Sequence, residues 1–108
     1  FNVTYGIRIN GKFVNITKNV IINASFNGIQ IVGNNGSISK NEIKFCDKGI
    51  AIGAADNNTI TENVIKECKT GIYIHATTNE KNYIFKNYLY NNSDYQVYDD
   101  AHFPKGVQ

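Results

Sequence analysis

The chain repeats itself about every 22 residues, and this period constrains the fold more than any other feature of the sequence. The segment Asn58–Gly71, NTITENVIKECKTG, superposes without a gap on the segment Gly36–Gly49, GSISKNEIKFCDKG. Periods of this length are typical of solenoids, in which each repeat forms one structural unit that packs on the next. The register of the repeat therefore predicts which side chains lie over one another.

Three sequence anchors recur in the same order. The first is Gly-Ile-x-Ile, which begins at Gly6, Gly28, Gly49 and Gly71. The second is a lone isoleucine, found at Ile16, Ile38, Ile60 and Ile84. The third is Asn-x-(Ile/Leu), which begins at Asn19, Asn41, Asn63 and Asn87. At each anchor, apolar residues alternate with other residues, and Gly, Asn, Asp and Ser separate one anchor from the next. This pattern predicts a short β-strand at each anchor.

A coil of three short strands buries little apolar surface, so it is stable only when neighbouring coils stack on it. In the stack, each strand pairs in parallel with its copy in the next coil, about 4.8 Å away. The chain is therefore predicted to be an all-β, parallel β-helix of about four to five coils with three short strands each. A degenerate fifth copy of the first anchor, Asp94-Tyr95-Gln96-Val97, begins the last coil.

The stacking also predicts the interior and the boundaries of the repeats. The inward columns are Ile7/Ile29/Ile50/Ile72, Ile9/Ile31/Ile52/Ile74/Val97, Ile16/Ile38/Ile60/Ile84 and Ile21/Ile43/Ile65/Leu89. We expect one domain, 1–108, with repeats at about 5–27, 28–48, 49–70, 71–93 and 94–100 and a C-terminal cap at 101–108. Because the sequence begins inside a repeat, the chain is expected to be a fragment of a longer protein or a unit of an assembly.

The pattern Asn-Thr-Ile-Thr-x-Asn-x-Ile-x-x-Cys-x-x-Gly-Ile-x-Ile resembles the right-handed parallel β-helix repeat. It is similar to the NosD-like group of carbohydrate-binding proteins and sugar hydrolases, and more distantly to pectate lyases. The resemblance covers residues 5–100 and implies a right-handed coil. It also implies that the sheet built from the Gly-Ile-x-Ile strands, with its adjoining loops, carries any saccharide groove.

Composition limits the partners. The net charge is +2 with acidic and basic residues interspersed, so the chain lacks the basic patch of a nucleic-acid-binding protein. No apolar run is long enough to cross a bilayer. Asn-x-Ser/Thr sequons occur at Asn2, Asn15, Asn23, Asn35, Asn57 and Asn91. They arise either by chance from turn asparagines beside strand threonines or as glycosylation sites of the extracellular or cell-surface protein that we predict.

Two polar columns have structural interpretations. The aligned amides of Asn19, Asn41, Asn63 and Asn87 are expected to hydrogen-bond from coil to coil. Cys46 and Cys68 occupy equivalent positions in adjacent coils, after Ala24, and are expected to be stacked free thiols. Neither a metal site nor a cofactor is predicted, because two cysteines lack the further ligands that zinc prefers. The chain has no methionine, and His75 and His102 are far apart in sequence.

The outward rows of the Gly-Ile-x-Ile strands provide the candidate binding site. Small side chains at Ala51 and Gly53 predict a hollow between larger ones. The predicted substrate-binding residues are Arg8, Gln30, Tyr73, His75, Gln96 and Tyr98. Aromatic faces stack on sugar rings, and amide or guanidinium groups bind hydroxyls. The alternative interpretation of these outward rows is an ordinary sheet face that is exposed to solvent and carries a few aromatic residues.

No catalytic residue is predicted. Glycoside hydrolysis requires two carboxylates facing each other across the bond, and the acidic residues lie off the candidate rows. Asp56 alone follows a candidate strand and is expected to reach its edge near His75. The predicted function is a noncatalytic scaffold that binds polysaccharide. The alternatives are part of a polysaccharide lyase, glycoside hydrolase or epimerase, and a structural protein that associates end to end into fibres.

Overall fold

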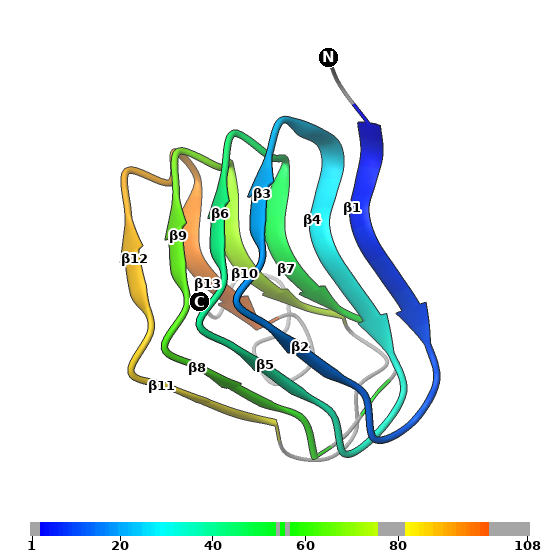
Figure 1. Ribbon diagram of the computed structural model, residues 1–108. Helices are drawn as coiled ribbons and strands as arrows, with labels where there is room; N and C mark the ends of the chain where they lie inside the picture. Colours follow the sequence, from blue (N-terminus) through cyan, green and yellow to red (C-terminus); the bar gives the residue numbers. More distant parts are fainter. Residues whose placement is uncertain (1–2, 54, 56, 76–81, 100–108) are drawn as a thin grey trace.

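The repeat anchors form three parallel sheets, which are the sides of a β-helix. The computed structural model describes residues 3–53, 55, 57–75 and 82–99, and contains thirteen strands and no helix among them (Figure 1). The Gly-Ile-x-Ile anchors form sheet A, of strands β1 (Val3–Asn10), β4 (Ala24–Val32), β7 (Lys48–Ile52), β10 (Thr70–Ile74) and β13 (Tyr95–Asp99). The described residues thus include no helix that could span a membrane.

The other two anchors form the remaining sides. The lone isoleucines are central in sheet B, of strands β2 (Asn15–Thr17), β5 (Ser37–Ser39), β8 (Thr59–Thr61) and β11 (Tyr83–Phe85). The third anchors form sheet C, of strands β3 (Val20–Ile22), β6 (Glu42–Lys44), β9 (Val64–Lys66) and β12 (Tyr88–Tyr90). Every strand pair is parallel, and Figure 1 shows the strands of each sheet side by side. The predicted all-β parallel β-helix is confirmed, with about four coils.

The pairing places isoleucine over isoleucine throughout the interior. Ile29 pairs with Ile50 and Ile50 with Ile72 in sheet A, while Ile38 pairs with Ile60 in sheet B. The fully buried isoleucines are Ile29, Ile31, Ile38, Ile43, Ile50, Ile52, Ile60, Ile65 and Ile72. β-branched side chains have few χ1 rotamers, so identical residues pack on one another in the same orientation. The predicted inward columns are confirmed for the first four coils.

The last coil differs from the prediction by two residues. Val97 pairs with Ile72 and Tyr98 with Tyr73, so Val97 does not continue the Ile74 column as expected. The fifth repeat has no glycine to mark its start. Backbone hydrogen bonds from Ser93 N to Cys68 O and from Asp94 N to Lys69 O place the additional residues in the corner before β13. The predicted cap, residues 101–108, lies outside the described residues, as do Asp56 and His102.

The three corners of the coil differ in how much their length varies. The B–C corner always has two residues, and the first of them adopts a positive φ of 57–59° in Lys18, Lys40, Glu62 and Lys86. The A–B corner lengthens from four residues (11–14 and 33–36) to six (53–58) and then eight (75–82). The sequence period accordingly rises from 22 residues between Asn41 and Asn63 to 24 between Asn63 and Asn87.

The asparagine column, whose members are the second residues of the B–C corners, is confirmed as a hydrogen-bonded ladder. Asn63 Oδ1 accepts hydrogen bonds from Asn41 N at 3.0 Å and Asn41 Nδ2 at 2.9 Å. Asn63 Nδ2 donates to Ile38 O at 3.0 Å and Asn87 Oδ1 at 2.9 Å. Both ends of a buried amide are thereby satisfied. The ladder links each coil to the next.

A second asparagine pair, which the sequence analysis missed, stabilises the A–B corner. Asn58 is fully buried, and its Oδ1 accepts from Gly36 N at 2.8 Å. Asn58 N and Nδ2 both donate to Asn82 Oδ1. The equivalent position in the preceding coil is Gly36, so no column of asparagines is visible in the sequence there.

The glycine that begins each sheet A anchor is required by close packing. A Cβ placed on Gly49 would lie 2.4 Å from Ile65 Cγ2 and 2.6 Å from Gly71 O. We expect Gly49→Ala to lower the free energy of unfolding by about 2 kcal/mol, because overpacking forces backbone shifts that cost about 1–3 kcal/mol. Urea denaturation measures this loss. Gly11→Ala is the control, since a Cβ there would meet only Val14 Cγ2 at 3.9 Å, and equal losses in the two variants would contradict the packing argument.

Candidate functional site on sheet A

A local break in the alternation at the sheet A glycines moves the outward position from the glycine to the residue before it. A Cβ on Gly28 would point inward, 2.7 Å from Ile43 Cγ2, although the next residue, Ile29, also faces the interior. Two successive inward positions put Asn27 and Gln30 together on the outside, where Asn27 Nδ2 donates to Gln30 Oε1 at 2.8 Å. Tyr5, Asn27 and Lys48, which directly precede Gly6, Gly28 and Gly49, therefore belong to the outer surface.

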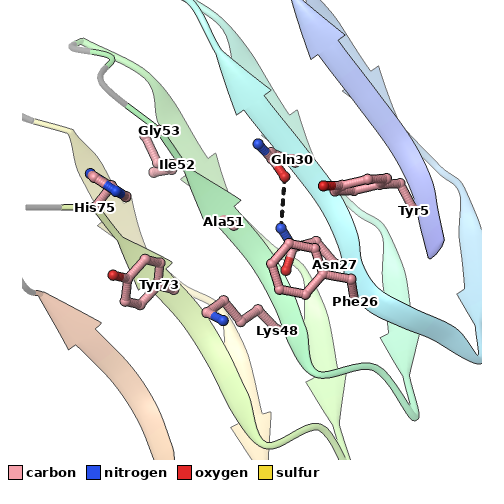
Figure 2. A pocket seen from close by; sticks show the side chains of 10 residues that line it. All are labelled: Tyr5, Phe26, Asn27, Gln30, Lys48, Ala51, Ile52, Gly53, Tyr73 and His75. Carbon is pink, nitrogen blue, oxygen red and sulfur yellow. Dashed lines mark hydrogen bonds between the residues drawn. The ribbon is translucent and has the colours of Figure 1, made fainter. Parts of the chain in front are cut away.

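The outer surface of sheet A contains a half-open hollow of about 260 Å³, which we call the sheet A hollow. Ala51 on β7 lies in the middle of the lining, and Gly53 directly follows β7 at its edge, with larger side chains from β4 on one side and from Tyr73 and His75 on the other (Figure 2). The lining residues are Tyr5, Phe26, Asn27, Gln30, Lys48, Ala51, Ile52, Gly53, Tyr73 and His75. This volume is slightly below the range of about 300–1,000 Å³ that is usual for small-molecule sites. The predicted depression at Ala51 and Gly53 is thus present.

Aromatic rings border the hollow on both sides. Tyr5 and Phe26 meet edge to face with centroids 5.6 Å apart, and Tyr73 meets His75 similarly at 6.3 Å. Lys48 Nζ lies between these borders, 5.0 Å from the Phe26 centroid and 5.1 Å from the Tyr73 centroid. A cation over aromatic faces is attracted by the ring quadrupoles. These contacts hold the rings in fixed orientations around the small residues.

The hollow also contains hydrogen-bonding groups. Lys48 Nζ forms an ion pair with Asp47 Oδ2 at 3.2 Å. Asn27 is 3 % exposed, and its Oδ1 has no hydrogen-bond partner, although its Nδ2 binds Gln30. Buried polar atoms without partners are rare and call for an explanation such as water or a bound ligand.

The structure brings together three of the six predicted binding residues. Gln30, Tyr73 and His75 line the hollow, and Figure 2 shows them around Ala51 and Gly53. Arg8 lies beside the hollow rather than in it, with its Cζ 4.9 Å from the Tyr5 centroid. Arg8 is therefore a neighbour of the site on the β1 side.

The register difference in the last coil gives its two predicted binding residues, Gln96 and Tyr98, different surroundings. Tyr98 stacks on Tyr73 with centroids 5.6 Å apart and also on Tyr95 at 4.7 Å, so it extends the aromatic border. Gln96 precedes Tyr98 by two residues on β13, so the register places it beside Gly71. Its Oε1 accepts a hydrogen bond from Asn92 Nδ2 at 2.7 Å. The predicted position of Gln96 beside Tyr73 is wrong.

Tyr5, Phe26, Asn27 and Lys48 line the hollow but are not among the predicted binding residues. Alternation within the Gly-Ile-x-Ile run predicts outward positions only after the glycine, and these four residues precede it. Their signal is present in the sequence, because polar or aromatic residues stand directly before Gly6, Gly28 and Gly49. No carboxylate lies among the described residues that line the hollow.

Cys46 and Cys68 form a second unusual cluster, at the corner between sheets C and A. Both thiols are free and buried, with exposures of 6 % and 2 %. Each follows a residue with positive φ, Phe45 at 60° and Glu67 at 56°. A hydrogen bond from the Cys68 thiol lowers the pKa of Cys46, while the same contact and burial raise the pKa of Cys68. The expectation of stacked free thiols is confirmed.

Comparison with known proteins identified one family. The family model NosD, described as periplasmic copper-binding protein, matches residues 1–105. Searches of curated proteins and of solved structures gave no match. The family's periplasmic description is compatible with the predicted location outside the cytoplasm.

The copper in the family description requires suitable ligands. Within the part of the chain that the structure describes, no three His, Cys, Asp or Glu side chains come together. The sequence has no methionine, so it lacks the axial ligand common in blue-copper sites. The residues that the structure describes therefore do not fit a Cu(II) centre.

The family match and the structure agree on the architecture. The matched region, residues 1–105, includes every strand of the three-sided β-helix. The repeat anchors that predicted the fold recur throughout this region. The chain therefore belongs to the NosD family.

Proposed function

We propose that the chain is a noncatalytic β-helix scaffold that binds a saccharide chain in the sheet A hollow. The observation that carries this proposal is the pairing of small residues, Ala51 and Gly53, with aromatic borders on either side. Sugar rings present apolar C–H faces to aromatic rings and hydroxyls to polar groups. Gln30 and Lys48 supply hydrogen-bond donors, and the unsatisfied Asn27 Oδ1 supplies an acceptor when the surrounding side chains admit a hydroxyl.

The direction of the hollow favours a chain over a single sugar. The hollow crosses strands β4, β7 and β10, and the stack of Tyr73, Tyr98 and Tyr95 continues its aromatic border onto β13. The step from Tyr73 to Tyr98 crosses from one coil to the next, and the step from Tyr98 to Tyr95 runs along β13, so the aromatic border is longer than one sugar ring. An extended oligosaccharide is therefore the ligand class that this surface fits.

Binding is tested with a glycan array followed by calorimetry on any oligosaccharide that binds. We expect Tyr73→Ala to weaken binding about tenfold, because an aromatic contact contributes about 0.5–1.5 kcal/mol beyond its buried area. Tyr83→Ala is the matched control, since Tyr83 is also an exposed strand tyrosine but lies on sheet B. Equal affinities of wild type and Tyr73→Ala would exclude the sheet A hollow as the site.

A product assay distinguishes the alternative function, a polysaccharide-cleaving enzyme, from a noncatalytic binding protein. A lyase releases unsaturated ends and a hydrolase releases reducing ends, and both chemistries require acid and base groups beside the bond. We expect neither product from any oligosaccharide that the array identifies.

The predicted end-to-end association stays a prediction, and β1 and β13, the two edges of sheet A, are where a second copy would pair.

A further inference from the structure

The sheet A hollow contains a buried acceptor that no described residue satisfies. Asn27 is 3 % exposed, and its Nδ2 donates to Gln30 Oε1 at 2.8 Å. Its Oδ1 is also buried and has no hydrogen-bond partner. A buried polar atom without a partner costs free energy, and a ligand group that donates a hydrogen bond removes this cost. The hollow is therefore expected to take a ligand with an N–H or O–H group directed at Asn27 Oδ1.

Lys48 adds a donor on the neighbouring strand. It pairs with Asn27 in the register of β4 and β7, and its Nζ lies 5.0 Å from the Phe26 centroid and 5.1 Å from the Tyr73 centroid. Among the described residues that line the hollow, Lys48 is the one with a permanent charge, and Asp47 Oδ2 already pairs with it at 3.2 Å. The hollow therefore favours an uncharged ligand group that offers a donor to Asn27 and an acceptor to Lys48.

The space between these polar groups and the aromatic border is small and apolar. Figure 2 shows Ala51 between Asn27 on one side and Tyr73 on the other, and the buried Ile52 also contributes to the lining. The volume of about 260 Å³ is less than the roughly 300 Å³ or more of a site that encloses a whole small molecule. The hollow therefore fits a substituent of a sugar, while the sugar ring itself stacks on the aromatic border. A hydroxyl alone would leave the apolar part of this space unfilled.

We infer that the sheet A hollow recognises the acetamido group of an N-acetylated amino sugar. The inference rests on the proposed saccharide binding and names the class of sugar. An acetamido group is uncharged, and it combines an N–H donor for Asn27 Oδ1, a carbonyl acceptor for Lys48 Nζ and a methyl group for the space over Ala51. The N–H and C=O of a trans amide point in opposite directions. Partners on two neighbouring strands, β4 and β7, therefore suit this group.

Admission of the acetamido group requires movement of side chains alone. The Lys48 side chain is partly exposed and Phe26 is exposed, so both can change rotamer and uncover Asn27 Oδ1. Rotamer changes over a fixed backbone are the common adjustment at binding sites. Gln30 holds the Asn27 amide by its Nδ2 end, so the Oδ1 end is the one left for the ligand.

The test is calorimetry of the full chain with tetramers of N-acetylglucosamine, glucose and glucosamine that have the same linkage and differ only in one ring substituent. We expect the N-acetylglucosamine tetramer to bind at least about tenfold more tightly than the other two, because it alone fills both hydrogen-bonding positions and the methyl position. The glucosamine tetramer also brings an ammonium group near Lys48. Tetraalanine, which has amide groups but no sugar ring, should not bind.

Single substitutions assign the recognition to Asn27. In Asn27→Ala the N-acetylglucosamine and glucose tetramers should bind about equally, whereas a merely structural role would weaken both and keep their ratio. Gln30→Glu should keep the ratio even if both affinities fall, because a carboxylate only accepts and so holds Asn27 Nδ2 in the same bond. Asn10→Ala is the matched control, since Asn10 is exposed on β1 of the same sheet and does not line the hollow. Circular dichroism establishes that each variant is folded.

The outcomes separate a failure of this inference from a failure of the proposed function. If the glucose tetramer binds as tightly as the N-acetylglucosamine tetramer, or if the array identifies only glycans without acetamido groups, the inference is overturned and saccharide binding stands. Tetraalanine binding as tight as that of the N-acetylglucosamine tetramer would overturn the sugar as the source of the amide. No binding to the tetramers or to any glycan on the array would overturn both proposals. Array binding confined to glycans with N-acetylated sugars, and lost in Asn27→Ala, supports the inference.

Discussion

Replacing Asn63 by alanine is expected to lower the free energy of unfolding by about 3 kcal/mol or more. The substitution leaves Asn41 N and Asn41 Nδ2 without their shared acceptor and removes the side-chain donor to Ile38 O. Asn63 is fully buried, so water does not replace these partners in the folded chain. A buried group left without a partner costs about 1–3 kcal/mol. Asn41 Nδ2 keeps Ile16 O as an acceptor, so the loss falls mainly on Asn41 N and Ile38 O.

Asn19→Ala is the matched control for this prediction. Asn19 belongs to the same ladder but is partly exposed, and its Nδ2 donates to Thr17 O and Asn41 Oδ1. We expect a loss of about 1 kcal/mol or less, because water reaches the groups that remain. Urea denaturation followed by far-ultraviolet circular dichroism compares the two variants. Similar losses in the two variants would show that the ladder contributes no more to the free energy of unfolding in the interior than at its end.

Ile50→Ala is expected to cost about 3–4 kcal/mol, within the range for large-to-small changes in a packed core. Ile50 is fully buried and pairs with Ile29 on one side and Ile72 on the other. A cavity in the middle of this column removes contacts from both neighbouring coils. Because stability in a solenoid depends on contacts between neighbouring repeats, the loss also weakens the coupling of the coils on either side.

Ile22→Ala provides the comparison on the outer face. Ile22 is 44 % exposed on sheet C, so its truncation removes little buried surface and should cost less than about 1 kcal/mol. The same denaturation experiment measures both changes. An Ile50→Ala midpoint indistinguishable from that of Ile22→Ala would contradict the assignment of Ile50 to the core.

The repeat made most of the fold predictable. Identical residues at a fixed period must occupy equivalent positions in successive coils, so the isoleucine columns and the Asn41–Asn63 ladder could be assigned by alignment alone. The prediction was wrong where the repeat is degenerate. No glycine marks the start of the fifth copy, and the longer corner before β13 shifts Val97 from Ile74 to Ile72.

The candidate site was only half predictable, for a local geometric reason. Alternation within a strand correctly placed Gln30 and Tyr73 on the outside. It gives no outward position for Asn27 and Lys48, which are not among the predicted residues, because the chain bends at the following glycine and gives two successive inward positions. That bend depends on close contact with sheet C, for example between Gly28 and Ile43. A contact between distant strands is not encoded in the spacing of one strand.

The unequal corners determine where this architecture tolerates change. The two-residue B–C corner is constant, whereas the A–B corner doubles from four residues to eight along the chain without disturbing the pairing of the strands beyond it. Gly53 and His75, which line the sheet A hollow, are the first residues of the two longer A–B corners. Insertions and deletions in this corner would reshape the edge of the hollow while leaving the hydrophobic interior intact, so this corner is where the architecture accepts added segments.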